Sequence, residues 1–129
     1  MAIWNLGSIN ADLFYSLPRF PEAGETLAST SHARGLGGKG TNISVASARA
    51  AARVHHIGAV GADGRWARDR LLEYGVDVTH ITESISATGH AIIATDQTGE
   101  NQIILFGGAN ETLETSHIQA ALSLSLIHI

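Results

Sequence analysis

Four glycines within six residues, directly before a helical pattern, constrain this chain more than any other feature. The segment reads Gly35-Leu36-Gly37-Gly38-Lys39-Gly40, and residues 41–53 then carry small and aliphatic side chains at helical spacing. Consecutive glycines let the backbone approach a ligand closely, and the first amides of a helix point free N–H donors at it. The segment therefore predicts either a ligand-binding helix start or a tight structural turn with Asn42 as the helix cap.

The same segment matches the dinucleotide-binding fingerprint only in its letters. That fingerprint requires a buried strand before the loop and an acidic residue about 20 residues after it. Residues 29–34 make a poor buried strand. About 20 residues after the loop, where the acidic residue should be, the chain has Val54-His55-His56. An NAD-dependent oxidoreductase domain of the Rossmann type stays an alternative. A Walker phosphate loop is excluded, because Gly40 follows Lys39 where Ser or Thr should coordinate magnesium.

Strand and helix patterns alternate along much of the chain. Strands are expected at 2–6, at 54–60 and from 76, and helices at 41–53, 65–74 and 111–122. This order predicts an α/β fold, a parallel sheet covered by helices. Leu71 and Leu72 are expected as core contacts, and the apolar segment 123–129 resembles a strand.

Further strands fall outside that alternation and predict a small separate sheet. They are expected at 13–17, at 26–34 and in a hairpin over 88–106, whose turn at 96–100 contains Gly99.

Two polar side chains, Asn10 and Asp12, are expected in the loop after the first strand. Ligands of open α/β sheets bind outside the carboxyl ends of strands. An amide and a carboxylate can each bind a pair of vicinal hydroxyls, although an Asx turn is the alternative role. Lys39 and Asn42 would add donors from the glycine segment, which suits a polyhydroxylated ligand.

Composition excludes several classes of function. The chain has 129 residues, a length typical of one domain, with 12 acidic and 8 basic residues and a net charge of −4. It carries no basic cluster for nucleic acid or an anionic membrane surface, and no apolar run that could span a bilayer. The absence of cysteine and of a basic N-terminal signal region predicts a cytoplasmic protein. Seven histidines lack zinc-site spacing, so no metal site is predicted.

Five motifs occur in the order in which one enzyme family has them: Gly7–Asp12, Pro21–Thr26, Gly37–Asn42, Gly58–Asp63 and Gly107–Asn110. In these motifs the chain resembles the ribokinase-like sugar kinases, also called PfkB carbohydrate kinases, and within them the ribokinase branch most. The resemblance implies a three-layer αβα fold with a Rossmann-like parallel sheet and a small β-sheet lid over the sugar. It also implies phosphorylation of a hydroxyl of a pentose or similar sugar, with ATP and Mg²⁺.

The resemblance also implies roles for individual residues. Sugar hydroxyls would be bound by Asn10, Asp12, Gly38, Lys39 and Asn42, and Ala91 and Leu105 would be apolar lid contacts. A homodimer through the lid is implied as well.

The chain departs from the family in what it lacks. The Gly-Ala-Gly-Asp signature, which holds the catalytic base, does not occur in the sequence, so no catalytic residue is assigned. Residues 1–122 are therefore expected to form the N-terminal part of a truncated kinase, inactive alone, and 123–129 to be a non-native tail. A non-catalytic sugar-binding module is a further alternative.

Overall fold

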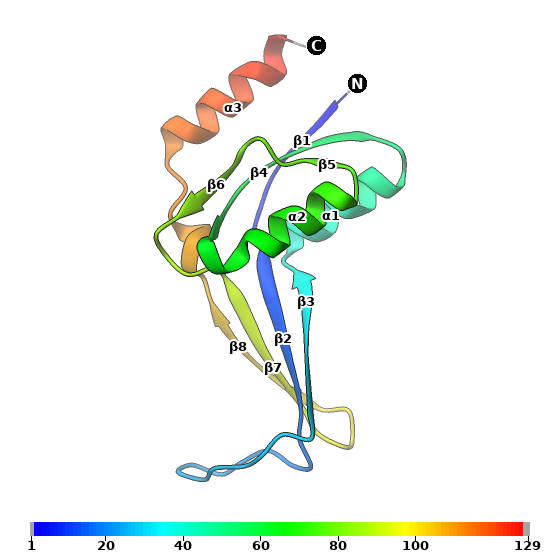
Figure 1. Cartoon of the computed structure of the whole chain (residues 1–129), viewed down its shortest axis with the longest axis vertical. Helices are drawn as coiled ribbons and strands as arrows, with labels where there is room; N and C mark the ends of the chain where they lie inside the picture. Colours follow the sequence, from blue (N-terminus) through cyan, green and yellow to red (C-terminus); the bar gives the residue numbers. More distant parts are fainter. Residues whose placement is uncertain (1, 128–129) are drawn as a thin grey trace.

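The computed structural model describes residues 2–127 and contains two separate sheets (Figure 1). The main sheet is formed by β1 (Ala2–Leu6), β4 (Arg53–Gly61), β5 (Val76–Asp77) and β6 (Ile81–Ser84). β4 pairs in parallel with β1 on one side and with β5 and β6 on the other. The predicted parallel sheet is confirmed, and β6 is a strand that the sequence patterns did not indicate.

Helices lie on both faces of the main sheet. One face is covered by α1 (Lys39–Arg49) and α2 (Arg65–Glu73), and α3 (Thr115–Ile127) lies against the other. The alternation along β4 shows the two sides: Val54 packs in the core beneath α1 and α2, whereas His55 stacks on Trp4 on the face where Leu124 of α3 lies. Short 3-10 turns cover Ala62–Gly64 and Gly108–Glu111. The layers agree with the predicted αβα arrangement.

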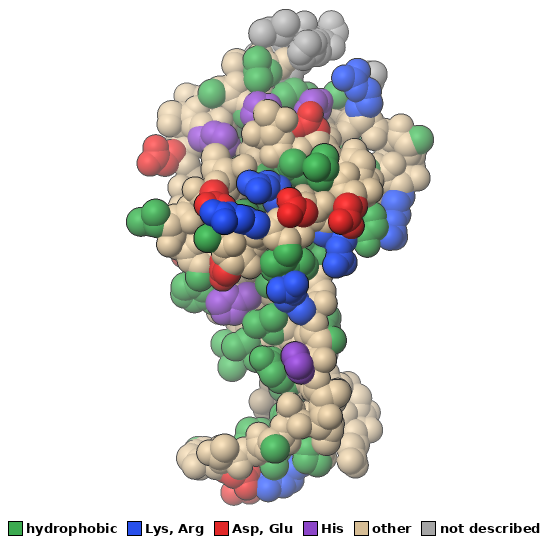
Figure 2. Space-filling model, viewed as in Figure 1, with side chains coloured by type: hydrophobic (Ala, Val, Ile, Leu, Met, Phe, Trp, Pro, Cys, Tyr) green, Lys and Arg blue, Asp and Glu red, His purple; other side chains and the backbone are tan. Residues whose placement is uncertain are grey.

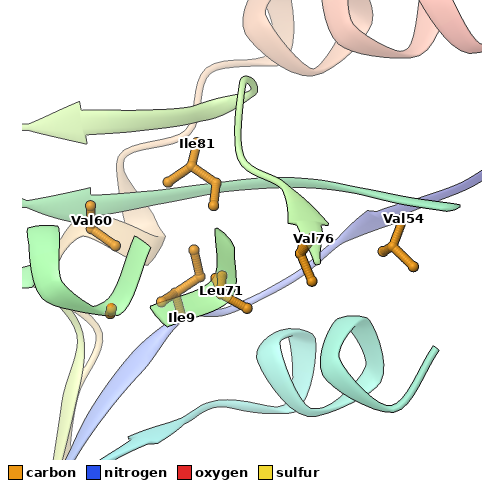
Figure 3. Packing of buried hydrophobic residues seen from close by; sticks show 7 residues of the cluster. Ile9, Val54, Val60, Leu71, Val76 and Ile81 are labelled. Atoms are coloured by element: carbon orange, nitrogen blue, oxygen red, sulfur yellow. The ribbon is translucent and has the colours of Figure 1, made fainter. Parts of the chain in front are cut away.

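The hydrophobic core lies between the main sheet and the first two helices (Figure 3). Its buried members are Ile9, Val54, Val60, Ala67, Leu71, Val76 and Ile81. The expectation that Leu72 also faces the core was wrong, because Leu72 is 58% exposed while Leu71 is fully buried. Successive helical residues point about 100° apart, so only one of the two can face the sheet.

A buried polar network attaches α1 to the main sheet. Nδ2 of Asn5 donates to Oγ of Ser44 at 2.8 Å, Ser44 lies 2.7 Å from Nδ1 of His56, and Nε2 of His56 lies 3.0 Å from the carbonyl of Gly7. Because a carbonyl only accepts, Nε2 carries the proton and Nδ1 accepts from Ser44. His56 thus points toward α1, whereas His55 stacks on Trp4 on the opposite face of the sheet.

Acid is expected to destabilise the fold through His56. Burial lowers the pKa of this imidazole from its ordinary value of 6.5. The unfolded chain therefore takes up a proton first as the pH falls below 6.5, and stability that is present above that value is lost below it. Urea unfolding between pH 7.5 and 5.5 measures the loss, which His56→Gln should reduce. An equal pH dependence in the His56→Gln variant would contradict this assignment.

The second sheet, which we call the lid sheet, extends away from the α/β layers (Figure 1). Its strand order is β3 (Ser31–Gly37), β2 (Asn10–Ser16), β7 (His90–Thr95) and β8 (Asn101–Phe106). The hairpin predicted over 88–106 is confirmed: β7 and β8 are antiparallel, and β7 pairs with β2 rather than with the main sheet.

Two lid strands begin elsewhere than expected. The first strand begins at Asn10 instead of residue 13, because Asn10–Asp12 already pair with β3. The second begins at Ser31 instead of residue 26, because its partner β2 ends at Ser16, two residues before Pro18. Apart from the bonds that Thr30 donates to the carbonyl of Ser16, residues 26–30 thus pair with no described strand.

The C-terminal segment also differs from expectation. The predicted helix over 111–122 begins at Thr115, since Glu111 closes a 3-10 turn, and it continues to Ile127 where a strand-like tail was expected. No described strand pairs with it. Residues 128 and 129 of the predicted tail lie outside the described residues, and its non-native origin stays a prediction.

Among the described residues, no helix is long and apolar enough to cross a membrane.

Candidate functional site

The candidate site lies where the lid sheet joins the main sheet. The chain passes between the α/β layers and the lid sheet four times, and each passage contains glycine, at Gly7, Gly38, Gly89 and Gly107. Gly38 caps α1 with a φ of 94°, and a Cβ there would lie 2.7 Å from the carbonyl oxygen of Ser8. Glycine is therefore needed at this position for conformation and for space.

Asn10 and Asp12 are strand residues, not loop residues as predicted. Both lie on β2, two positions apart, so their side chains share one face of the lid sheet. The loop ends early because β3 and β7 hydrogen-bond to β2 on either side. On the neighbouring strand β3, Gly37 is paired with Asn10 and Gly35 is paired with Asp12. Neither glycine has a side chain that could cover the Asn10 or Asp12 side chain.

The predicted apolar contacts lie in the same row as Asp12. Asp12 pairs with Ala91 of β7, and Ala91 pairs with Leu105 of β8, so the three side chains lie on one face. Ala91 is buried and Leu105 is 70% exposed. The structure thus brings together four of the predicted site residues on a single surface.

The Asp12 carboxylate is aimed at the glycine segment. A Cβ on Gly37 would lie 2.2 Å from Oδ2 of Asp12, so this carboxylate occupies the space above the glycine. No described residue donates a hydrogen bond to it, and burial raises its pKa above the ordinary value. A partly buried carboxylate without a protein donor is a candidate binding group.

Asn110 is a site component that the analysis of individual residues missed. Its Nδ2 donates to Oδ1 of Asn10 at 2.7 Å, and its own Oδ1 accepts from the N–H of Ile9 at 2.9 Å. The Gly107–Asn110 motif was the only sequence signal, and it gave no indication that its asparagine reaches a residue 100 positions away.

The predicted site residues at the start of α1 do not all lie beside Asn10 and Asp12. Gly38 lies at the passage, where a Cβ would be 3.1 Å from the N atom of Asn10. Lys39 is exposed, and its side chain makes no hydrogen bond or ion pair to a described residue. Asn42 is exposed within α1 rather than capping it, and lines a hollow between α1 and α2 together with Leu36. No described contact joins Asn42 to Asn10 or Asp12, and its role stays a prediction.

Asp63 holds the passage into β7. Its Oδ1 accepts from the N–H and the hydroxyl of Thr88, at 2.9 and 2.8 Å. Thr88 in turn accepts from the N–H of Gly61 at 2.8 Å. These bonds, led by the backbone N–H of Thr88, hold the pKa of Asp63 below its ordinary value of 3.8.

Removing the Asp63 carboxylate should loosen this passage. We expect Asp63→Ala to lower the free energy of unfolding by about 1–2 kcal/mol, since the buried N–H of Thr88 loses its acceptor. The contribution exists above the ordinary pKa and is lost as the pH falls below it. Urea unfolding measures both effects, with Asp69→Ala on exposed α2 as control; equal losses in the two variants would contradict the assigned role.

A separate pocket lies away from this site. It measures about 360 Å³ and is lined by residues from the start of β1 and β4, among them Ala2, Trp4, Arg53 and His55. These are the amino ends of the parallel strands, whereas ligands of such sheets bind beyond the carboxyl ends. Within the described part of the chain, no group of three or more His, Asp or Glu side chains could hold a metal ion.

The topology disagrees with a dinucleotide site. The strand before the glycine segment, β3, belongs to the lid sheet and not to the parallel sheet. The strand–loop–helix unit that presents pyrophosphate to a helix is therefore not formed at residues 35–40.

Comparisons with known proteins agree with the resemblance to carbohydrate kinases. The family model described as "pfkB family carbohydrate kinase" matches residues 3–128. A ribokinase of Haemophilus influenzae is 43% identical over 111 residues, covering 84% of this chain and 36% of the relative. An Arabidopsis thaliana ribokinase structure, complexed with ribose and ATP, has a TM-score of 0.79 at 32% identity, covering 85% of this chain and 38% of that one. A ribokinase structure from Giardia lamblia has a TM-score of 0.85 at 32% identity, covering 95% and 41%.

This chain thus spans little more than a third of the length of the Haemophilus relative. Its fold matches that of the ribokinase structures, and its sequence matches the ribokinase sequences and the family model. The chain belongs to the pfkB family of carbohydrate kinases.

Proposed function

We propose that this chain supplies the sugar-binding part of an ATP-dependent kinase that phosphorylates a hydroxyl of a ribose-like pentose. The observation that carries the proposal is the Asp12 carboxylate, which has no donor among the described residues and lies over Gly37. The ribose complex of the Arabidopsis relative supports a pentose as the ligand class.

The site residues have different roles in binding the sugar, according to their chemistry. Asp12 accepts hydrogen bonds from sugar hydroxyls, and Asn10 binds a neighbouring hydroxyl from the same sheet face. Ala91 and Leu105 contact the apolar face of the ring. Gly38, Lys39 and Asn42 complete the set from the start of α1, where no side chain caps the helix.

The described residues do not fit a nucleotide or magnesium. They contain no acidic cluster for a metal ion, and the glycine segment has Gly40 where a phosphate loop needs a hydroxyl. We therefore place ATP, Mg²⁺ and the catalytic base in the part of the relatives that the match does not cover. A cytoplasmic location is proposed on the sequence features alone.

A second copy of this chain is the proposed partner of the lid sheet. β8 is exposed along its whole length, and Ile103, Ile104, Leu105 and Phe106 are each at least half exposed. Figure 2 shows hydrophobic side chains gathered along this narrow part of the molecule. An exposed apolar edge strand pairs readily with another chain. Light scattering should show a dimer that Ile104→Lys dissociates; a monomer at all concentrations would contradict it.

A chimaera tests the kinase proposal. In it, residues 1–122 of this chain replace the matched segment of the Haemophilus influenzae ribokinase. We expect ATP-dependent phosphorylation of ribose. A folded chimaera that binds ribose without phosphorylating it would favour the sugar-binding module, and NADH fluorescence enhancement by the chain would favour the oxidoreductase.

A further inference from the structure

We propose that Asn110 is a positioning residue that fixes the side-chain amide of Asn10 with its NH₂ group turned toward the sugar. Asn10 then presents a hydrogen-bond donor to the sugar. The inference rests on the proposed function for the identity of the ligand, but the orientation itself follows from contacts within the chain.

The orientation starts at a backbone group that can only donate. The N–H of Ile9 lies 2.9 Å from one end of the Asn110 amide, so that end must be the oxygen. The other end, Nδ2, then faces the carbonyl oxygen of Ile9 at 3.2 Å and the Asn10 side chain at 2.7 Å.

Asn10 inherits its orientation from Asn110. The two protons of Asn110 Nδ2 point at two acceptors, and a carbonyl oxygen of Ile9 can be nothing else. The atom of Asn10 that faces Asn110 is therefore Oδ1, which leaves Nδ2 of Asn10 with no acceptor among the described residues. The free NH₂ group lies on the face that also carries Asp12.

The surroundings are shaped for this pair. A Cβ on Gly89 would lie 2.2 Å from Nδ2 of Asn110 and 2.7 Å from Oδ1 of Asn10, so any side chain there would separate them. Asn110 is itself held in a 3-10 turn, where its N–H donates to Gly107 at 3.2 Å, and the neighbouring N–H of Ala109 donates to Ala87 at 2.8 Å.

The consequence is a site with two opposite polarities. An ionised Asp12 only accepts hydrogen bonds, and the oriented Asn10 turns its NH₂ donor to the ligand. A vicinal diol satisfies both, since one hydroxyl donates to Asp12 while its neighbour accepts from Asn10.

Hydrogen exchange of side-chain amides in the 129-residue chain tests the orientation without any sugar. We expect the Asn110 NH₂ protons to exchange slowly and the Asn10 NH₂ protons to exchange quickly. In Asn110→Asp, the new carboxylate attracts the Asn10 NH₂ group, which should become protected. The chemically identical change Asn101→Asp, on exposed β8, should leave both unchanged.

Kinetics of the chimaera test the consequence for the sugar. Asn110→Asp should raise KM for ribose about tenfold with little change in kcat, since about one hydrogen bond is lost on binding. Protected Asn10 protons in the unmodified chain would overturn the proposal, even if the variant fails to fold. The expected exchange pattern without any ribose phosphorylation by the chimaera would support the orientation and overturn the proposed function.

Discussion

Replacing Asp12 with alanine in the chimaera should lower kcat/KM for ribose on the order of 100-fold. Hydrogen bonds to a charged group contribute about 1.5–3 kcal/mol each, so losing even one or two of them accounts for that factor. The affinity for ATP should be unchanged, because no described residue fits a nucleotide. Steady-state kinetics with each substrate varied in turn measure both quantities.

The matched control is Asp69→Ala, which removes the same carboxylate from the exposed surface of α2. It should leave both kinetic constants unaltered. A large loss of ATP affinity in Asp12→Ala, with ribose affinity intact, would reverse the assignment of this carboxylate.

The Asp12 carboxylate should lower the free energy of unfolding of the chain when no sugar is bound. Burial raises the pKa of Asp12, so the folded chain disfavours its ionised form. That cost is present above the folded pKa and vanishes as the pH falls below the ordinary value. Asp12→Asn should therefore weaken ribose binding without lowering the melting temperature of the free chain at neutral pH.

Gly40→Ala should destabilise the chain by about 3 kcal/mol or more, the upper end for overpacking, although helix propensity alone predicts a gain of about 1 kcal/mol. An added Cβ would lie 2.4–2.5 Å from backbone atoms of Gly7 and Ser8, which cannot move without displacing β1 from α1. Urea unfolding followed by circular dichroism measures the change.

Gly35→Ala is the matched control for this substitution. The nearest atom to its Cβ is Cε2 of Phe14 at 3.3 Å, the end of a side chain that is 40% exposed and able to shift. We expect a change within about 1 kcal/mol. Equal losses in the two variants would show that the close approach of Gly7 and Gly40 does not decide stability.

Sequence patterns predicted those elements whose signal is local. The hairpin over 88–106 follows from its turn at 96–100. The helix predicted over 65–74 is α2, and Gly75 follows its cap at a φ of 92°.

The rest depended on contacts that no local pattern records. Asn10 and Asp12 look like loop residues because polar side chains rarely begin a strand, and only pairing with β3 and β7 makes them one. β6 is short and is stabilised by pairing with β4, and Asn110 reaches Asn10 only through the folded passage between the sheets.

A crystal structure of the chimaera with bound ribose tests the central claim most directly. We predict sugar hydroxyls within hydrogen-bond distance of the Asp12 carboxylate and of Nδ2 of Asn10, with the ring against Ala91 and the start of α1 beside it. Ribose bound elsewhere, with Asp12 facing only solvent, would contradict the claim that this chain supplies the sugar site.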